Sequence, residues 1–212
     1  AIFDQPFGNA SAIPAFYCAR MAKADGVTRM LGGDGGDELF GGNARYAKQH
    51  LFSLYEKTPV LVRKGILEPL VFGLPGGSAL PLVQKARSYI EQASIPMPAR
   101  TETYNLLERY GPVEVFTREF LETVNPGNPA ALLEDVYHEN KASSLINRML
   151  AFDRKFTLAD NDLPKVAKAC ELAAMEVAFP LISDEIVAFS LRLEPHLKLN
   201  GTKLRYFFKE AL

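Results

Sequence analysis

GGDGGDELFGG, from Gly32 to Gly42, places six glycines and three acidic residues in one short stretch of the chain. Glycine gives the backbone access to conformations that other residues avoid. The three acids repel one another unless a cation or a basic ligand offsets their charge. The apolar segment VTRML (27–31) comes directly before this stretch and is bounded by glycine on both sides, which predicts a buried strand. We therefore expect a strand, a glycine-rich loop and then a helix that begins near Asp37 or Glu38.

The residues before the strand predict a helix. Ser11 is a favourable N-cap residue, and Pro14 lies in the first turn, where a missing N–H costs little. Apolar residues then recur on one face until Gly26, which is expected to end the helix. Residues 11–50 thus predict one unit of an α/β sheet, and ligands bind such sheets at the carboxyl ends of the strands.

From Ala44 onward the pattern is helical. Apolar residues recur at helical spacing, and Pro, Gly, Asn and Asp separate the segments. The predicted helices cover residues 44–57, 59–73, 80–94, 101–109, 112–124, 128–139, 142–158, 162–175, 183–193 and 203–212. The predicted fold class is mostly α with a small α/β part: an α/β remnant over 1–50 and a helical part over 51–212. Because a lone strand cannot form a sheet, we expect its partner strands outside this chain.

Composition excludes several classes of protein. The 212 residues are 48% hydrophobic and 23% charged, which is ordinary for a globular protein. The net charge of −1 and the scattered basic residues argue against nucleic-acid binding, and no apolar stretch is long enough to cross a membrane. Cys18 and Cys170 are far apart in the sequence and are expected to be buried free thiols, which indicates a cytoplasmic protein.

Four interpretations of Gly32–Gly42 compete. Residues 32–40 fit one calcium-binding nonapeptide repeat, but that architecture needs several stacked copies. The stretch fails the dinucleotide-binding and P-loop patterns. It could be a structural turn whose acids cap the next helix. It could also be an anion and metal site, in which backbone N–H groups hold phosphate while Asp34 and Asp37 hold a metal or activate a nucleophile.

Three stretches resemble the asparagine synthetase family. MLGGDGGDELFGGNARY (30–46) is similar to the family signature, in which an apolar strand runs into Ser-Gly-Glu-Gly-x-Asp-Glu-Leu-Phe-Gly-Gly-Tyr. FDQPFGNASAIPAFYCAR (3–20) resembles the family's Asp-x-Pro-x-x-x-x-Ser segment, and residues 156–212 resemble its closing part, including a lysine followed by Leu-Arg at Lys203–Arg205. The three matches follow the family order along the whole chain.

The resemblance implies a synthetase domain with an adenine-nucleotide α-hydrolase-like (PP-loop ATPase) fold. Such a domain uses ATP and Mg²⁺ to adenylate the side-chain carboxylate of aspartate. Ammonia, released from glutamine by a separate glutaminase domain, then attacks the acyl-adenylate, and AMP and pyrophosphate are released. The resemblance also allows a homodimer.

The resemblance assigns roles residue by residue. Asp34 takes the place of the family glutamate that acts as the base toward ammonia. Asp37 takes the place of the aspartate that helps to bind magnesium pyrophosphate, and Lys203 matches the lysine that neutralises phosphate charge. The further positions expected to contact ATP or substrate are Gly33, Gly35, Gly36, Asp4 and Ser11.

The chain also departs from the family pattern. The family's ATP-binding loop, Ser-Gly-Gly-x-Asp-Ser, is missing, and PGGSAL (75–80) is no substitute because it lacks the Asp-Ser and follows no strand. We therefore expect the C-terminal part of a synthetase domain, without the glutaminase domain and the ATP loop, that binds no ATP productively by itself.

Other departures put the substrate in doubt. Asp34 is one methylene shorter than the family glutamate, and the family's charged residues are replaced within 166–168 and 176–183. The carboxylate substrate is then aspartate or another carboxylate. The alternative function is that of a non-catalytic relative, which acts as a binding or scaffold module.

Overall fold

The computed structural model describes residues 2–5, 7–73, 80–139 and 141–211. The chain forms two compact units. Unit 1 combines residues 1–47 with 142–212, and unit 2 comprises residues 48–141. PGGSAL (75–80) lies outside the described residues except for Leu80. The predicted boundary near residue 50 between an α/β remnant and a helical part stays a prediction.

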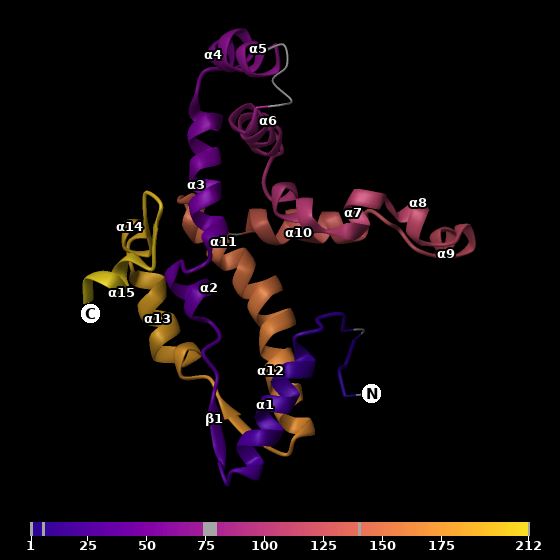
Figure 1. Ribbon diagram of the computed structural model, residues 1–212, viewed down its shortest axis with the longest axis vertical. Coiled ribbons are helices and arrows are strands. Elements are labelled where there is room, and N and C mark those ends of the chain that lie inside the picture. Colours follow the sequence, from indigo (N-terminus) through magenta and orange to yellow (C-terminus); the bar gives the residue numbers. More distant parts are fainter. Residues whose placement is uncertain (1, 6, 74–79, 140, 212) are drawn as a thin grey trace. The chain divides into compact units, whose positions relative to one another are not determined.

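Unit 1 begins with the predicted helix. Helix α1 (Ala12–Ala24) is followed by Gly26, whose φ of +82° breaks the helical path, as expected from the sequence. Ser11 occupies the N-cap position, but its hydroxyl bonds Asn9 Oδ1 (2.6 Å) and makes no capping hydrogen bond. Helix α1 packs against α12 (Leu163–Leu172), which returns from the far end of the sequence (Figure 1).

A parallel strand pair lies next to these helices. Strand β1 (Arg29–Leu31) pairs with β2 (Glu176–Ala178), and the Gly32 N–H extends the ladder to the Ala178 carbonyl at 2.8 Å. Strand β1 therefore has a partner within this chain, so the expectation that its partner strands all lie outside the chain is wrong. Strand β2 has only three residues, and a segment of that length is too short for an alternating strand pattern to be recognised in the sequence. The expectation of a buried strand is also wrong, because Leu31 is 71% exposed.

One core cluster of unit 1, between α1 and α12, contains mostly small side chains. Ala19 packs with Cys170, Ala173 and Met175, and Met30 of β1 contacts this cluster. Alanine at these positions lets α1 and α12 approach closely, so one face of the strand pair is covered. Both cysteines are free thiols, and only Cys170 is buried, so the burial expected for Cys18 is wrong.

The other elements of unit 1 surround the glycine stretch. Helix α2 (Gly36–Phe40) is a short helix within that stretch, and α3 (Ala44–Lys57) follows it. The remaining elements are α11 (Leu145–Asp153), the π-helix η4 (Arg154–Asp162), η5 (Pro180–Ile182), α13 (Asp184–Arg192), α14 (Pro195–Lys198), the hairpin β3 (Leu199–Asn200) and β4 (Lys203–Leu204), and α15 (Tyr206–Ala211).

Unit 2 is helical. Its elements after α3 are α4 (Val60–Val62), η1 (Arg63–Leu67), α5 (Glu68–Phe72), α6 (Pro81–Ala93), η3 (Ala99–Tyr104), α7 (Leu106–Tyr110), α8 (Pro112–Val115), α9 (Arg118–Thr123) and α10 (Asn128–Glu139). Phe52, Tyr55, Ile90 and Ala93 form its core. The prediction of a mostly helical chain is confirmed. No helix in the described residues is long and apolar enough to span a membrane.

Candidate functional site

The path of the glycine stretch depends on glycine at two positions. Gly35 has a φ of +94°, and a Cβ there would lie 2.3 Å from Cγ2 of Ile182. Gly41 has a φ of +73°, and its Cβ would lie 2.8 Å from the Lys198 carbonyl oxygen. Both residues combine a left-handed backbone with close approach to a neighbouring segment, so any side chain would displace the loop. The stretch therefore turns sharply from β1 into α2.

The turn borders an open cavity of about 390 Å³ within unit 1, at the carboxyl end of β1. It is lined by Gly33, Asp34, Gly35, Gly36, Asp37, Glu38, Asp162 and Arg205. Five of the residues that the sequence indicated for the site, all from the glycine stretch, line this one cavity. Gly33 has no atom near the position of a Cβ, so its backbone borders open space.

Asp37 forms an ion pair with Arg205 across the cavity. Nη2 and Nε of Arg205 both donate to the same oxygen, Oδ1 of Asp37, at 2.6 and 3.1 Å. Gly42 makes room for this pair, because a Cβ at that position would lie 1.9 Å from Oδ1 of Asp37 and 2.4 Å from Nε of Arg205. The need for glycine at the last position of the stretch is thus explained by an ion pair between two residues that are 168 positions apart in the sequence.

The carboxyl group of Asp34 is partly buried. Burial raises the pKa of its carboxyl above the ordinary value, and the charge of Asp162 acts in the same direction, while Lys165 opposes them. Lys165 itself donates to Asp162 at 2.6 Å. A carboxyl with a raised pKa is a better proton acceptor than an ordinary aspartate, so Asp34 is suited to act as a general base.

The lining of the cavity is strongly acidic. Glu38 is buried, and its pKa is raised by burial and by the charges of Asp37, Asp153 and Asp162. Among the lining residues, four are acids and Arg205 alone is basic. A cation, or an anion accompanied by a metal ion, is therefore favoured over a free anion.

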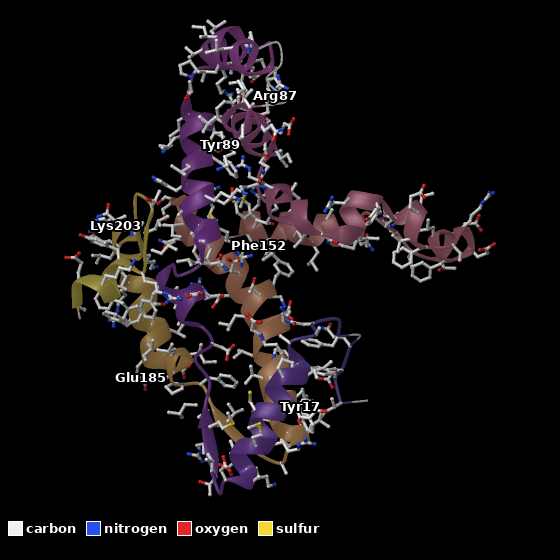
Figure 2. The ribbon with its side chains drawn as sticks, viewed as in Figure 1. Tyr17, Arg87, Tyr89, Phe152, Glu185 and Lys203 are labelled. Carbon is white, nitrogen blue, oxygen red and sulfur yellow. The ribbon has the colours of Figure 1, made fainter. Side chains whose placement is uncertain are left out.

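Three residues indicated by the sequence lie elsewhere. Asp4 borders a second cavity of about 250 Å³, which Lys168 also lines. Ser11 lines neither cavity. Lys203 is not among the lining residues either; it lies at the α14–α15 end of unit 1 (Figure 2), with Nζ 5.9 Å from the ring centroid of Tyr206. Their roles in binding substrate or phosphate stay predictions.

Three lining residues have no role in the sequence-based assignment: Glu38, Asp162 and Arg205. Glu38 is part of the quoted glycine stretch. Arg205 belongs to the Lys203–Arg205 motif, but Lys203 was assigned the phosphate role. Asp162 ends the π-helix η4, and π-helical turns are frequent at functional sites, although no sequence signal marks them.

The donor set fits Mg²⁺ held jointly with phosphate. Among the described residues, no group of three or more His, Cys, Asp or Glu side chains is arranged to hold a metal ion by itself. Mg²⁺ usually binds proteins through one or two carboxylates together with water and substrate phosphates. Asp37 meets that need, because its Oδ1 receives Arg205 while its Oδ2 accepts no side-chain hydrogen bond from the described residues.

A buried polar network anchors the chain just after the glycine stretch. Oδ2 of Asp153 accepts a hydrogen bond from the Tyr46 hydroxyl at 2.6 Å. The same oxygen forms an ion pair with Nη2 of Arg45, also at 2.6 Å. Tyr46 is fully buried, and Asp153 is 3% exposed. Burial raises the pKa of the Tyr46 hydroxyl, which keeps it a proton donor to Asp153. The network ties the start of α3 to the end of α11.

Lys198 supports the other side of the stretch. It is 2% exposed, and its Nζ donates to Oδ1 of Asn147 at 2.9 Å. Burial, reinforced by the charge of Arg154, lowers the pKa of Lys198 to about 8. Its carbonyl oxygen faces Gly41, so this buried lysine packs directly beneath the end of α2.

We expect the free energy of unfolding to rise with pH between about 8 and 10.5 because of Lys198. In that window the unfolded chain still binds the proton, since its lysine has the ordinary pKa of 10.5, whereas the folded chain has lost it. The full difference corresponds to about 3 kcal/mol. Urea titrations at several pH values should show a smaller rise in Lys198→Met, because the other titrating groups are common to both proteins. Equal slopes would contradict the prediction.

The asparagine synthase family model matches residues 1–212. A glutamine-hydrolysing asparagine synthetase of Bacillus subtilis is 24% identical over 215 residues, which cover 99% of this chain and 31% of that protein. Two proteins provisionally named glutamine-hydrolysing asparagine synthetases are also similar. The one from Mycobacterium tuberculosis is 25% identical over 99% of this chain and 30% of its own length, and the one from Methanocaldococcus jannaschii is 30% identical over 84% and 32%.

The chain thus spans about a third of the length of the relatives that it matches. No solved structure matches it significantly.

Proposed function

The chain belongs to the asparagine synthase family, and from this premise we propose that it supplies the magnesium-pyrophosphate and ammonia-activating part of an ATP-dependent, amide-forming ligase. One observation carries the proposal: a single cavity at the end of β1 is lined by Asp34, Asp37 and the glycines between them, together with Arg205. The proposed fold of the whole domain is that of the PP-loop ATPases, with this cavity as one half of the nucleotide site.

The proposed reaction has two steps. A carboxylate oxygen of the substrate attacks the α-phosphorus of ATP, and pyrophosphate leaves. Ammonia then attacks the carbon of the acyl-adenylate, Asp34 accepts the proton that the nitrogen loses, and AMP leaves with the oxygen that the carboxylate contributed. The raised pKa of Asp34 suits it to this proton transfer.

Asp37 would hold Mg²⁺ through its carboxylate, and Arg205 lies beside it. The bound Mg²⁺ would supply positive charge to offset the charge that develops on the departing pyrophosphate. Gly33, Gly35 and Gly36 line the cavity and carry no side chains, so phosphate oxygens can approach their backbone closely. These residues bind and orient the leaving group, whereas the loop that holds the rest of ATP is proposed to lie on another part of the protein.

The proposed substrates are aspartate or another carboxylate, and ammonia. The proposed ammonia source is glutamine, hydrolysed by a glutaminase domain, because the relatives are named glutamine-hydrolysing enzymes and are about three times as long as the matched region. Replacements at Ala178 and Ser183, where the family has charged residues, are the reason to include carboxylates other than aspartate. A homodimer is also part of the proposal.

We expect Asp34→Glu to retain activity and Asp34→Asn to lose most of it. A general base typically contributes about a hundredfold or more to rate, and only the glutamate variant keeps a carboxylate. The wild-type rate should fall on acidification at a pH above the ordinary range for aspartate, because burial raises the pKa of Asp34 and only its ionised form accepts a proton. Rates of amide formation across pH measure both effects, and an unchanged rate in Asp34→Asn would contradict this role.

The proposed function is tested with the complete gene product that contains this chain. It is incubated with ATP, Mg²⁺, ammonia or glutamine, and a panel of carboxylates headed by aspartate. We expect AMP and pyrophosphate in equal amounts with the amide. ADP and phosphate would contradict the proposal, and a protein that binds ATP but forms no product with any carboxylate would favour the alternative of a non-catalytic binding module.

A further inference from the structure

Arg205 is held in the cavity in a way that an ordinary surface arginine is not. Its backbone has a φ of +52°, in the left-handed region that residues other than glycine rarely adopt. Its N–H donates to the Gly41 carbonyl at 3.2 Å, which ties the end of the β3–β4 hairpin to the end of the glycine stretch. Strained backbone of this kind persists where the surrounding structure enforces it, and it concentrates at ligand-binding sites.

The ion pair that Arg205 forms is one-sided. Its Nε and Nη2 both donate to Oδ1 of Asp37, so the guanidinium does not use the paired geometry in which it would bond both carboxylate oxygens. The side chains of Arg205 and Asp37 are 54% and 35% exposed. Exposed ion pairs contribute little net stability, so this pair is readily exchanged for other partners.

The charges around the pair favour such an exchange. Asp34, Glu38 and Asp162 line the same cavity as Asp37, and Arg205 is the single basic residue among the lining residues. A phosphate group without a cation would meet a net negative surface. If a divalent cation instead binds Asp37, it displaces the guanidinium, and Arg205 becomes free to bond the phosphate oxygens that the cation brings with it.

We propose that Arg205 is an exchangeable counter-ion: it neutralises Asp37 in the empty site and transfers to the phosphate oxygens of a metal–pyrophosphate group when the metal takes Asp37. The proposal deepens the proposed function and rests on it. It gives Arg205 the phosphate role for which the sequence indicated Lys203, because Arg205 lines the cavity and Lys203 does not. It also makes binding of the anion conditional on the metal.

The test uses the 212-residue chain, with Mn²⁺ followed by electron paramagnetic resonance and pyrophosphate binding followed by calorimetry with and without Mg²⁺. Wild type should bind pyrophosphate only when Mg²⁺ is present. Arg205→Gln should bind Mn²⁺ alone about two- to fivefold more tightly, because the competitor for Asp37 is removed. The same variant should bind magnesium pyrophosphate about tenfold or more weakly, because it lacks the charged donor.

Lys209→Gln is the matched control, since it removes a positive charge on α15 that is exposed and does not line the cavity, and both affinities should stay unchanged. Arg205→Asn serves as a second variant, because asparagine tolerates a positive φ, and circular dichroism checks that each variant folds. Opposite changes in the two affinities support the proposal, whereas changes in the same direction, or none, overturn it. Binding of pyrophosphate without metal overturns it as well.

The outcomes separate this inference from the proposed function. A chain that shows the exchange, in a gene product that forms no AMP, would leave the inference standing and remove the ligase. A ligase whose activity is sensitive to Lys203→Gln and not to Arg205→Gln would support the proposed function and overturn the inference about Arg205.

Discussion

Replacing Asp37 by asparagine is expected to lower kcat/KM for amide formation by about a hundredfold or more. Asparagine keeps the size of the side chain and one oxygen acceptor for Arg205, but it removes the charge that Mg²⁺ requires. A catalytic metal contributes several kcal/mol of charge stabilisation in the transition state, and loss of its protein ligand removes a large part of that. Steady-state rates of pyrophosphate release, measured over a range of Mg²⁺ concentrations, check the result.

Stability separates this loss from misfolding. The Asp37–Arg205 pair is partly exposed to water, so Asp37→Asn should change the free energy of unfolding by less than about 1 kcal/mol. Asp25→Asn is a suitable control, because Asp25 is an exposed aspartate after α1 and does not line the cavity. Equal rates in Asp37→Asn and wild type at every Mg²⁺ concentration would exclude Asp37 as a metal ligand.

Replacing Asp153 by alanine is expected to cost about 3 kcal/mol of folding stability. The change leaves the buried Tyr46 hydroxyl without its acceptor and Arg45 without its counter-ion, and breaking a buried charged pair from one side typically costs about 3–5 kcal/mol. We expect the lower end, because the Arg45 side chain is 36% exposed and water can reach it. The midpoint of urea unfolding, followed by circular dichroism, measures the loss.

Two milder variants measure the contributions of the charge and of the hydrogen bond in this network separately. Asp153→Asn keeps an oxygen acceptor for Tyr46 and removes only the charge. Tyr46→Phe removes one hydrogen bond and should cost about 1 kcal/mol. Both should therefore be more stable than Asp153→Ala. A loss below about 1 kcal/mol in Asp153→Ala would show that the network does not anchor the chain after the glycine stretch.

Local patterns predicted the elements whose signals are local. Gly26 ends the first helix, and the glycine stretch joins a strand to a helix, because both depend on backbone preferences of adjacent residues. The helix predicted over 44–57 has the same bounds in the structure. Strand β2 was missed because its pairing with β1 joins residues 147 positions apart, and nothing in three residues encodes that partner.

Some residues of the candidate site could be predicted from local sequence, and others are brought to it only by the folded chain. Asp34 and Asp37 were indicated by the glycine pattern itself and by the resemblance that it carries. Arg205 and Asp162 come to the cavity from the hairpin and from the π-helix, so only the folded chain brings them close. The burial of Lys198 could not be predicted from the sequence either, because an isolated lysine beside a leucine gives no periodic signal.

Oxygen transfer tests the central claim of acyl adenylation most directly. The complete gene product is given ATP, Mg²⁺, ammonia and the carboxylate that it accepts, labelled with ¹⁸O in the reacting carboxyl group. If the carboxylate attacks the α-phosphorus, one labelled oxygen should appear in the phosphate of AMP, and pyrophosphate should remain unlabelled. Label in inorganic phosphate, or AMP free of label while amide forms, would contradict the account.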